Sequence, residues 1–134
     1  MVPGPVQAAA AVALDDDDHV MAQRRRYRGR LERLAAGLRG AGLDAAVPDG
    51  TFYLWVPAPD WARVQGEAEG RDGSWVLAEA LADAAGVLVS PGEFYGAAGH
   101  VRIAVVQPDE RIDLALDRLA ATDARLTAAP ASTT

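Results

Sequence analysis

The chain has 134 residues, enough for one domain with a modest hydrophobic core. It contains no cysteine, which excludes disulfides, thiolate metal sites and cysteine nucleophiles. The net charge of −6 argues against nucleic acid as the main partner, because phosphate binding depends on an excess of basic residues. No apolar run approaches the roughly 18 residues of a membrane span, and the first residues lack the pattern of a secretory signal. These features predict a soluble, cytoplasmic protein without a membrane or nucleic-acid partner.

All 13 basic residues are arginines, and the sequence contains no lysine. A strong G+C bias in the gene would account for this without a functional cause. The chemical consequence is the same in either case, because the chain offers no side-chain amine that could form a Schiff base.

The N-terminal part of the chain is predicted to be helical. Residues Pro5 to Leu14 are rich in alanine and begin with a proline at a tolerated first-turn position. The acidic cluster Asp15 to Asp18 is expected to cap the next helix, since carboxylates favour the positive end of the helix dipole. A metal site with His19 is a weaker alternative, because consecutive aspartates lack the spacing of a calcium loop. A long helix should follow from about Asp18 to Ala41, with one apolar face made of Tyr27, Leu31, Leu34 and Leu38.

The middle of the chain contains the strongest strand signal. Residues Thr51 to Val56 combine β-branched and aromatic side chains, and a short edge strand is conceivable at Ala45 to Val47. The stretch from Asp60 to Gly73 is polar and contains three glycines, which predicts an exposed loop. Ser74 is a candidate N-cap for a helix that continues through Ala85.

Residues Gly86 to Val106 are the most informative stretch. Two β-branched runs, Val87 to Ser90 and Val101 to Val106, flank a loop of glycine and proline. Both faces of the second run are apolar apart from Arg102, which predicts a strand covered on both sides. A buried guanidinium keeps its charge and needs an anion, either a protein carboxylate such as Glu93 or a ligand. A last helix is predicted to start at Pro108, Asp109 and Glu110.

This order of elements predicts an α/β fold of the α+β kind. One small sheet of about three strands would be packed by helices and preceded by a long helix, which with its N-terminal extension would belong partly to another structural unit. The tail after residue 126 is small and polar, and is predicted to be disordered.

Four segments, in this order, resemble the C-terminal part of pyridoxal-phosphate-dependent aminotransferases of fold type I, class I/II. They are PGPVQAAAAVAL with HVMAQRRRYRGRL, DGTFYLWV, GVLVSPGEFYG and HVRIAVVQPDERIDLALDRL. Within that family, the chain is most similar to the actinobacterial N-succinyldiaminopimelate aminotransferase type, which acts in lysine biosynthesis.

The resemblance implies a division of the chain. Residues 1–17 would be a remnant of the large cofactor-binding domain, residues 18–126 the small domain, and residues 127–134 a tail. Arg102 falls on the family arginine that binds the substrate α-carboxylate. Phe94 and Tyr95 fall in the family's PGxFYG loop, and Gly50 and Phe52 in its GxFY segment. For the two aromatic residues of the loop, simple packing is an equal alternative, and Gly92 and Gly96 need be no more than turn glycines.

The resemblance also implies a cofactor that this chain cannot hold alone. In the family, pyridoxal 5'-phosphate is bound by a lysine and other residues of the large domain, and family members are usually homodimers. Three hypotheses remain: a fragment of an aminotransferase, one subunit of a two-chain enzyme, or a non-catalytic small domain that binds carboxylates or a partner. The second hypothesis predicts an exposed apolar surface around Pro5 to Leu14.

Overall fold

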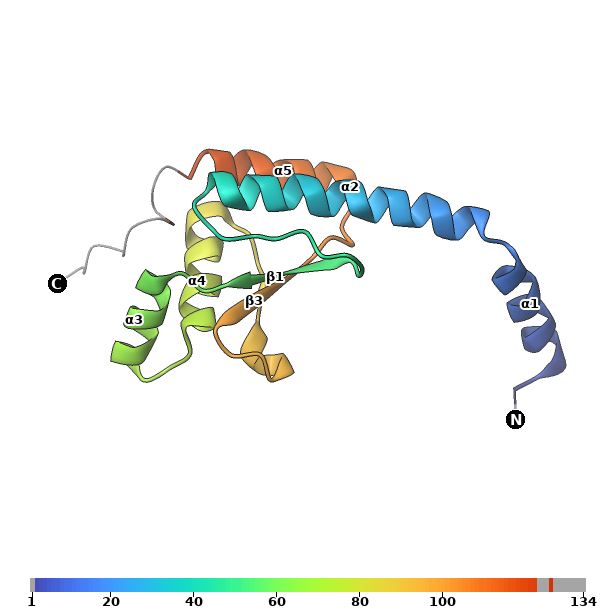
Figure 1. The fold of residues 1–134 in the computed structure, drawn as a ribbon, viewed down its shortest axis with the longest axis horizontal. Coiled ribbons are helices and arrows are strands. Elements are labelled where there is room, and N and C mark those ends of the chain that lie inside the picture. The colour runs from blue at the N-terminus through green and yellow to red at the C-terminus, as the bar shows by residue number, and fades with distance from the viewer. Residues whose placement is uncertain (1, 123–125, 127–134) are drawn as a thin grey trace.

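A small antiparallel sheet lies against several helices in the computed structural model, which describes residues 2–122 and 126 (Figure 1). The strand order is β1–β3–β2. The strands are β1 (Tyr53–Pro57), β2 (Ser90–Pro91) and β3 (His100–Ala104). The predicted α+β class with a small three-stranded sheet is therefore confirmed.

One face of the sheet forms the hydrophobic core. Leu54 and Val56 of β1 and Val101 of β3 are fully buried. Their main partners come from three helices: Leu31, Leu34, Ala35, Leu38, Leu77, Leu81 and Leu119. The other face, which carries Arg102 and Ala104, is only half-buried. The prediction that β3 is covered on both sides is therefore wrong for these residues, since the helices pack against one face alone.

Helices α2 (Asp18–Gly40) and α5 (Asp109–Ala120) lie side by side along this core (Figure 1). Arg30 of α2 is 8% exposed and joins the two helices, because its Nε donates to Asp109 at 2.7 Å. Its Nη1 donates to the Val105 carbonyl at 3.2 Å. The hydrogen bond from Arg30 lowers the pKa of Asp109. Arg30 is thus a buried cross-link between the two helices.

Helix α1 (Gly4–Asp15) stands apart from the sheet at the far end of α2 (Figure 1). None of its residues is buried, and Val6, Val12 and Leu14 are more than half exposed. Among residues 2–122, no helix combines the length and apolar character needed to cross a membrane.

The polar stretch after β1 is a helix, α3 (Asp60–Glu69), and the prediction of a loop there is wrong. Two of the glycines that suggested a loop, Gly66 and Gly70, have specific roles in this helix. Gly66 lies inside the helix, and a glycine is needed there because a Cβ would be only 2.7 Å from the Arg71 carbonyl oxygen. Gly70 ends the helix in the left-handed conformation, with φ 70°. One glycine permits close packing and the other terminates the helix.

Helix α4 (Gly73–Ala85) is capped by Asp72, not by the predicted Ser74. The Ser74 N–H donates to the Asp72 carboxylate at 2.9 Å, so the cap lies two residues earlier. The strands are also shorter than predicted. Residues 45–47 and 87–89 lie outside the sheet, and β1 begins at Tyr53. The predicted tail, residues 127–134, lies outside the described residues.

Candidate functional site

Arg102 lies at the centre of β3, on the open face of the sheet. It is opposite Trp55 of β1 and Ser90 of β2 in the antiparallel register. Side chains alternate along β1, so Tyr53 and Trp55 share the face of Arg102 while Leu54 points into the core. The sheet thereby places one cation among large aromatic side chains.

Two tyrosine rings hold the Arg102 guanidinium. Its Cζ lies 4.1 Å from the centre of the Tyr95 ring and 5.5 Å from that of Tyr53, which is cation–π geometry. Such contacts favour the charge without neutralising it.

Arg102 has no anionic partner in the described part of the chain. None of the ion pairs there includes it, and its Nε is buried without a hydrogen-bond partner. The alternative of a pair with Glu93 is not realised, because Glu93 accepts a hydrogen bond from Trp75 Nε1 at 2.6 Å. A buried donor without a partner is costly, so an acceptor that reached this nitrogen would be favoured.

Tyr95 reaches Arg102 from a short 3-10 helix, η1 (Gly92–Tyr95). Its ring meets that of Trp55 edge to face, with centroids 6.0 Å apart. Gly92 has a structural role beyond a turn, since a Cβ there would lie 2.6 Å from the His100 carbonyl oxygen. Gly96 ends η1 with φ 71°, a conformation that favours glycine.

The loop that carries Tyr95 is tied to the start of α4. Both carboxylate oxygens of Asp72 accept from the Gly99 N–H at 3.0 Å, while Oδ1 also accepts from Ser74. Burial raises the pKa of Asp72, but the hydrogen bonds from Ser74 and Gly99 outweigh it and the net pKa is lowered. Asp72 therefore joins a helix N-terminus to the segment just before β3.

Phe94 does not join the Arg102 cluster. It is 66% exposed and packs against Trp75, with ring centroids 5.1 Å apart. The two adjacent aromatic residues of the loop thus point to different neighbours, and only Tyr95 contacts the arginine.

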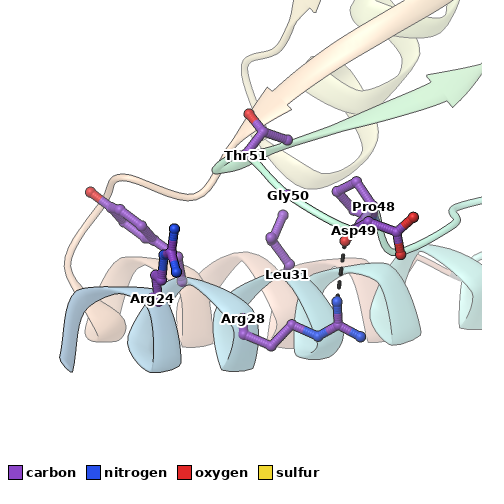
Figure 2. Close-up of a pocket in the computed structure, with 8 residues that line it drawn as sticks. Arg24, Arg28, Leu31, Pro48, Asp49, Gly50 and Thr51 are labelled. Carbon is purple, nitrogen blue, oxygen red and sulfur yellow. Dashed lines mark hydrogen bonds between the residues drawn. The ribbon is translucent and has the colours of Figure 1, made fainter. Parts of the chain in front are cut away.

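Phe52 links the cluster to a separate cavity. Its ring lies 5.6 Å from that of Tyr53 and 5.8 Å from that of Tyr27 on α2. Gly50 lines this cavity of about 440 Å³, and Arg102 is not among its lining residues (Figure 2). The lining residues are Arg24, Tyr27, Arg28, Leu31, Pro48, Asp49, Gly50 and Thr51.

Two arginines line the cavity, which lies at the Tyr27 end of the row of rings formed by Tyr53, Phe52 and Tyr27. Arg28 donates to the Pro48 carbonyl at 3.2 Å and pairs with Glu32 at 2.6 Å. Arg24 forms no ion pair with any described residue. Figure 2 shows both side chains on α2, and the dashed line marks the hydrogen bond from Arg28 to the Pro48 carbonyl.

The sequence did not single out Tyr53, Trp55 or Asp72. The alternation of aromatic residues along β1 was a usable signal for the first two, because Tyr53 and Trp55 are two positions apart and must share a face with any cross-strand partner. Asp72 carried no such signal, since its second partner, Gly99, is 27 residues away.

Comparison with known proteins gives one consistent family. Residues 1–119 match the family model "Aminotransferase class I and II". The chain is 44% identical over 120 residues to 4-dedimethylamino-4-oxo-anhydrotetracycline transaminase OxyQ of Streptomyces rimosus, covering 88% of this chain and 30% of OxyQ. It is 31% identical over 122 residues to an LL-diaminopimelate aminotransferase of Dehalococcoides mccartyi, covering 89% and 29%.

A solved structure agrees with these relatives. The aromatic aminotransferase of Pyrococcus horikoshii superposes with a TM-score of 0.69 at 29% identity, covering 87% of this chain and 30% of that protein. The chain thus spans less than a third of the length of the curated relatives it matches.

Proposed function

Because the chain belongs to the class I and II aminotransferase family, we propose that it acts as the small domain of an aminotransferase and that Arg102 binds the α-carboxylate of the substrate. The observation that carries the proposal is the unpaired guanidinium of Arg102, which has a buried Nε without a hydrogen-bond partner among the described residues. Amino acids and 2-oxo acids both supply the carboxylate that would satisfy it. A planar guanidinium makes two parallel, charge-assisted hydrogen bonds to such a group.

The aromatic cluster orients the Arg102 guanidinium that would bind the carboxylate. Tyr95 and Tyr53 restrict the guanidinium, and Trp55 supports Tyr95 from the neighbouring strand. A fixed carboxylate fixes the Cα of the substrate, and correct orientation of a reacting bond contributes a large part of catalysis. In this proposal Arg102 and Tyr95 position the substrate.

Pyridoxal phosphate is the cofactor of this family, and the residues of this chain do not fit its attachment. Attachment needs a lysine amine, and all 13 basic residues are arginines. The cofactor supplies carbanion stabilisation when it is bound. We assign it no residue here and propose that another polypeptide region supplies the lysine.

Helix α1 supports the need for another polypeptide region. It buries none of its residues, although Val6, Val12 and Leu14 are apolar. Exposed apolar helices of this kind are commonly covered by a partner surface. We propose that a cofactor-binding region covers α1, in the same chain or in a separate subunit, and that the complete enzyme is a homodimer.

For the substrate, we propose N-succinyl-LL-diaminopimelate with glutamate as amino donor, in lysine biosynthesis. The relatives named for LL-diaminopimelate support an amino acid with a second polar end. The row Tyr53, Phe52 and Tyr27 leads from Arg102 to the cavity of Arg24 and Arg28. A long substrate with several carboxylates would meet arginines at both ends of this row.

The carboxylate clamp can be tested in a chimera that supplies the missing lysine. Residues 18–122 would replace the matching segment of OxyQ, to which the chain is 44% identical. Arg102→Gln should lower kcat/KM by about 100-fold, on the order of 3 kcal/mol, because a charged pair with the substrate is lost. Arg63→Gln, at an exposed position of α3, is the matched control and should leave kcat/KM unchanged. An active chimera that tolerates Arg102→Gln would refute the assignment.

The substrate proposal has its own test in the chain itself. NMR titration with glutamate should shift the signals of Arg102 and Tyr95 only. N-succinyl-LL-diaminopimelate should in addition shift those of Tyr27 and Gly50, because it reaches the cavity of Arg24 and Arg28. If both compounds shift the same residues, the long substrate is not favoured by this surface.

A further inference from the structure

A second groove, lined by both apolar and polar groups, lies just before the start of β2. It has a volume of about 400 Å³, within the roughly 300–1,000 Å³ usual for binding pockets. Its walls are the segment that leads into β2, the end of β3 and one face of α5. The lining residues are Leu34, Gly86, Val87, Leu88, Ile103, Ala104, Gln107, Arg111, Ile112, Leu114, Ala115 and Arg118.

The groove exists because β2 is short. Pairing with β3 stops at Ser90 opposite Arg102, although the preceding residues 87–89 have strand-like side chains. Within the described residues, the N–H groups of Leu88 and Val89 make no backbone hydrogen bond. Leu88 is 88% exposed. An unpaired, apolar edge of this kind is a template for another extended chain.

The two charged residues that line the groove are both arginines. Arg111 and Arg118 are its only titratable lining residues, and neither forms an ion pair with a described residue. They are two turns apart on α5, about 10 Å along the helix axis. The protein as a whole is acidic, with a net charge of −6. The groove therefore combines apolar side chains such as Leu88 and Ile103 with two arginines at a spacing that the helix fixes.

We propose that this groove binds an extended peptide segment of another polypeptide, with apolar side chains on the floor and carboxylates paired with Arg111 and Arg118. The unpaired N–H groups of Leu88 and Val89 favour a peptide over a small apolar molecule, because a peptide backbone supplies carbonyl acceptors. Five extended residues span about 13 Å between the first and last Cα atoms, so acidic residues at both ends reach both arginines. This inference does not depend on the proposed aminotransferase role.

The test uses two synthetic peptides and the full chain. Acetyl-Glu-Val-Ile-Val-Glu-amide is titrated against the ¹⁵N-labelled protein, and acetyl-Lys-Val-Ile-Val-Lys-amide is the charge-reversed probe. The acidic peptide should give saturable shifts of the Leu88 and Val89 amide signals, and it should bind at least tenfold more tightly than the basic peptide. Equal affinities, or shifts confined to other surfaces, would overturn the proposal.

A charge swap separates specific pairing from general attraction. In a variant with both Arg111→Glu and Arg118→Glu, the preference should invert towards the basic peptide. Both positions are exposed on α5, so the fold is expected to persist, and circular dichroism checks this. Arg63→Glu on α3 adds negative charge away from the groove and should leave the preference unchanged. If this control inverts the preference as well, or if sedimentation shows that a second copy of the chain fills the groove and excludes the peptide, the proposal is wrong.

Discussion

The guanidinium of Arg102 rests against the ring of Tyr95, with Cζ 4.1 Å from the ring centre. The contact joins β3 to η1, and η1 belongs to a loop that Asp72 and Trp75 tie to α4. The direction of the arginine is thus set by residues outside its own strand.

Replacing Tyr95 should release Arg102. In Tyr95→Leu the cation–π contact is lost, at a cost of about 0.5–1 kcal/mol in the free energy of unfolding. The Nε–H of Arg102 should then exchange with solvent faster, as measured by NMR. Tyr95→Phe keeps the ring and is the matched control. Unchanged exchange in Tyr95→Leu would show that Tyr53 alone positions the arginine.

Asp72 should make the stability depend on pH in the acid range. Its pKa is lowered in the folded protein, so its contribution is complete above the ordinary aspartate pKa of about 3.9. That contribution is lost as the pH falls through the lower, folded-state pKa. Asp72→Asn, which keeps a capping side chain, should flatten the loss of stability below about pH 4 in urea titrations.

The control for this variant is Asp44→Asn. Asp44 is exposed and makes no side-chain hydrogen bond with the described residues. It should keep the pH dependence of the wild type. An equal flattening in both variants would mean that total charge, and not the Asp72 cap, controls the acid response.

Two glycines in helices should respond to alanine in opposite directions. Gly66→Ala places a Cβ 2.7 Å from the Arg71 carbonyl oxygen and should destabilise the protein by about 1–3 kcal/mol. Gly29→Ala in α2 meets no atom within 4 Å and should stabilise it by about 0.5–1 kcal/mol. Thermal and urea unfolding measure both. A neutral Gly66→Ala would contradict the tight packing of α3 against the start of α4.

Leu126 should contribute to the core although it follows the last helix. It is 1% exposed, and its carbonyl accepts a hydrogen bond from Trp61 Nε1 at 2.8 Å. Leu126→Ala should lower the free energy of unfolding by about 2–4 kcal/mol, because it leaves a cavity. Leu114→Ala, at a position 37% exposed, should cost clearly less. Equal losses would show that Leu126 is not a true core residue.

The sequence by itself predicted the helices with clear periodicity and the class of fold, and it indicated Arg102 as a candidate for binding an anion. Side-chain spacing along α2 and α5 is local information, since each helix closes its own hydrogen bonds. Arg102 stood out because a guanidinium in a β-branched run that is predicted to be buried on both faces needs an anion.

Only the tertiary structure decided which neighbours meet. Asp72 and Gly99 are 27 residues apart, and Arg30 and Asp109 are 79 apart, so no local sequence pattern predicts either contact. The same holds for α3, where Gly66 reads as a loop signal until the close approach of Arg71 shows why glycine is required. It also holds for the face of β3 that stays open, because strand alternation divides a strand into two faces but packing selects the one that is covered.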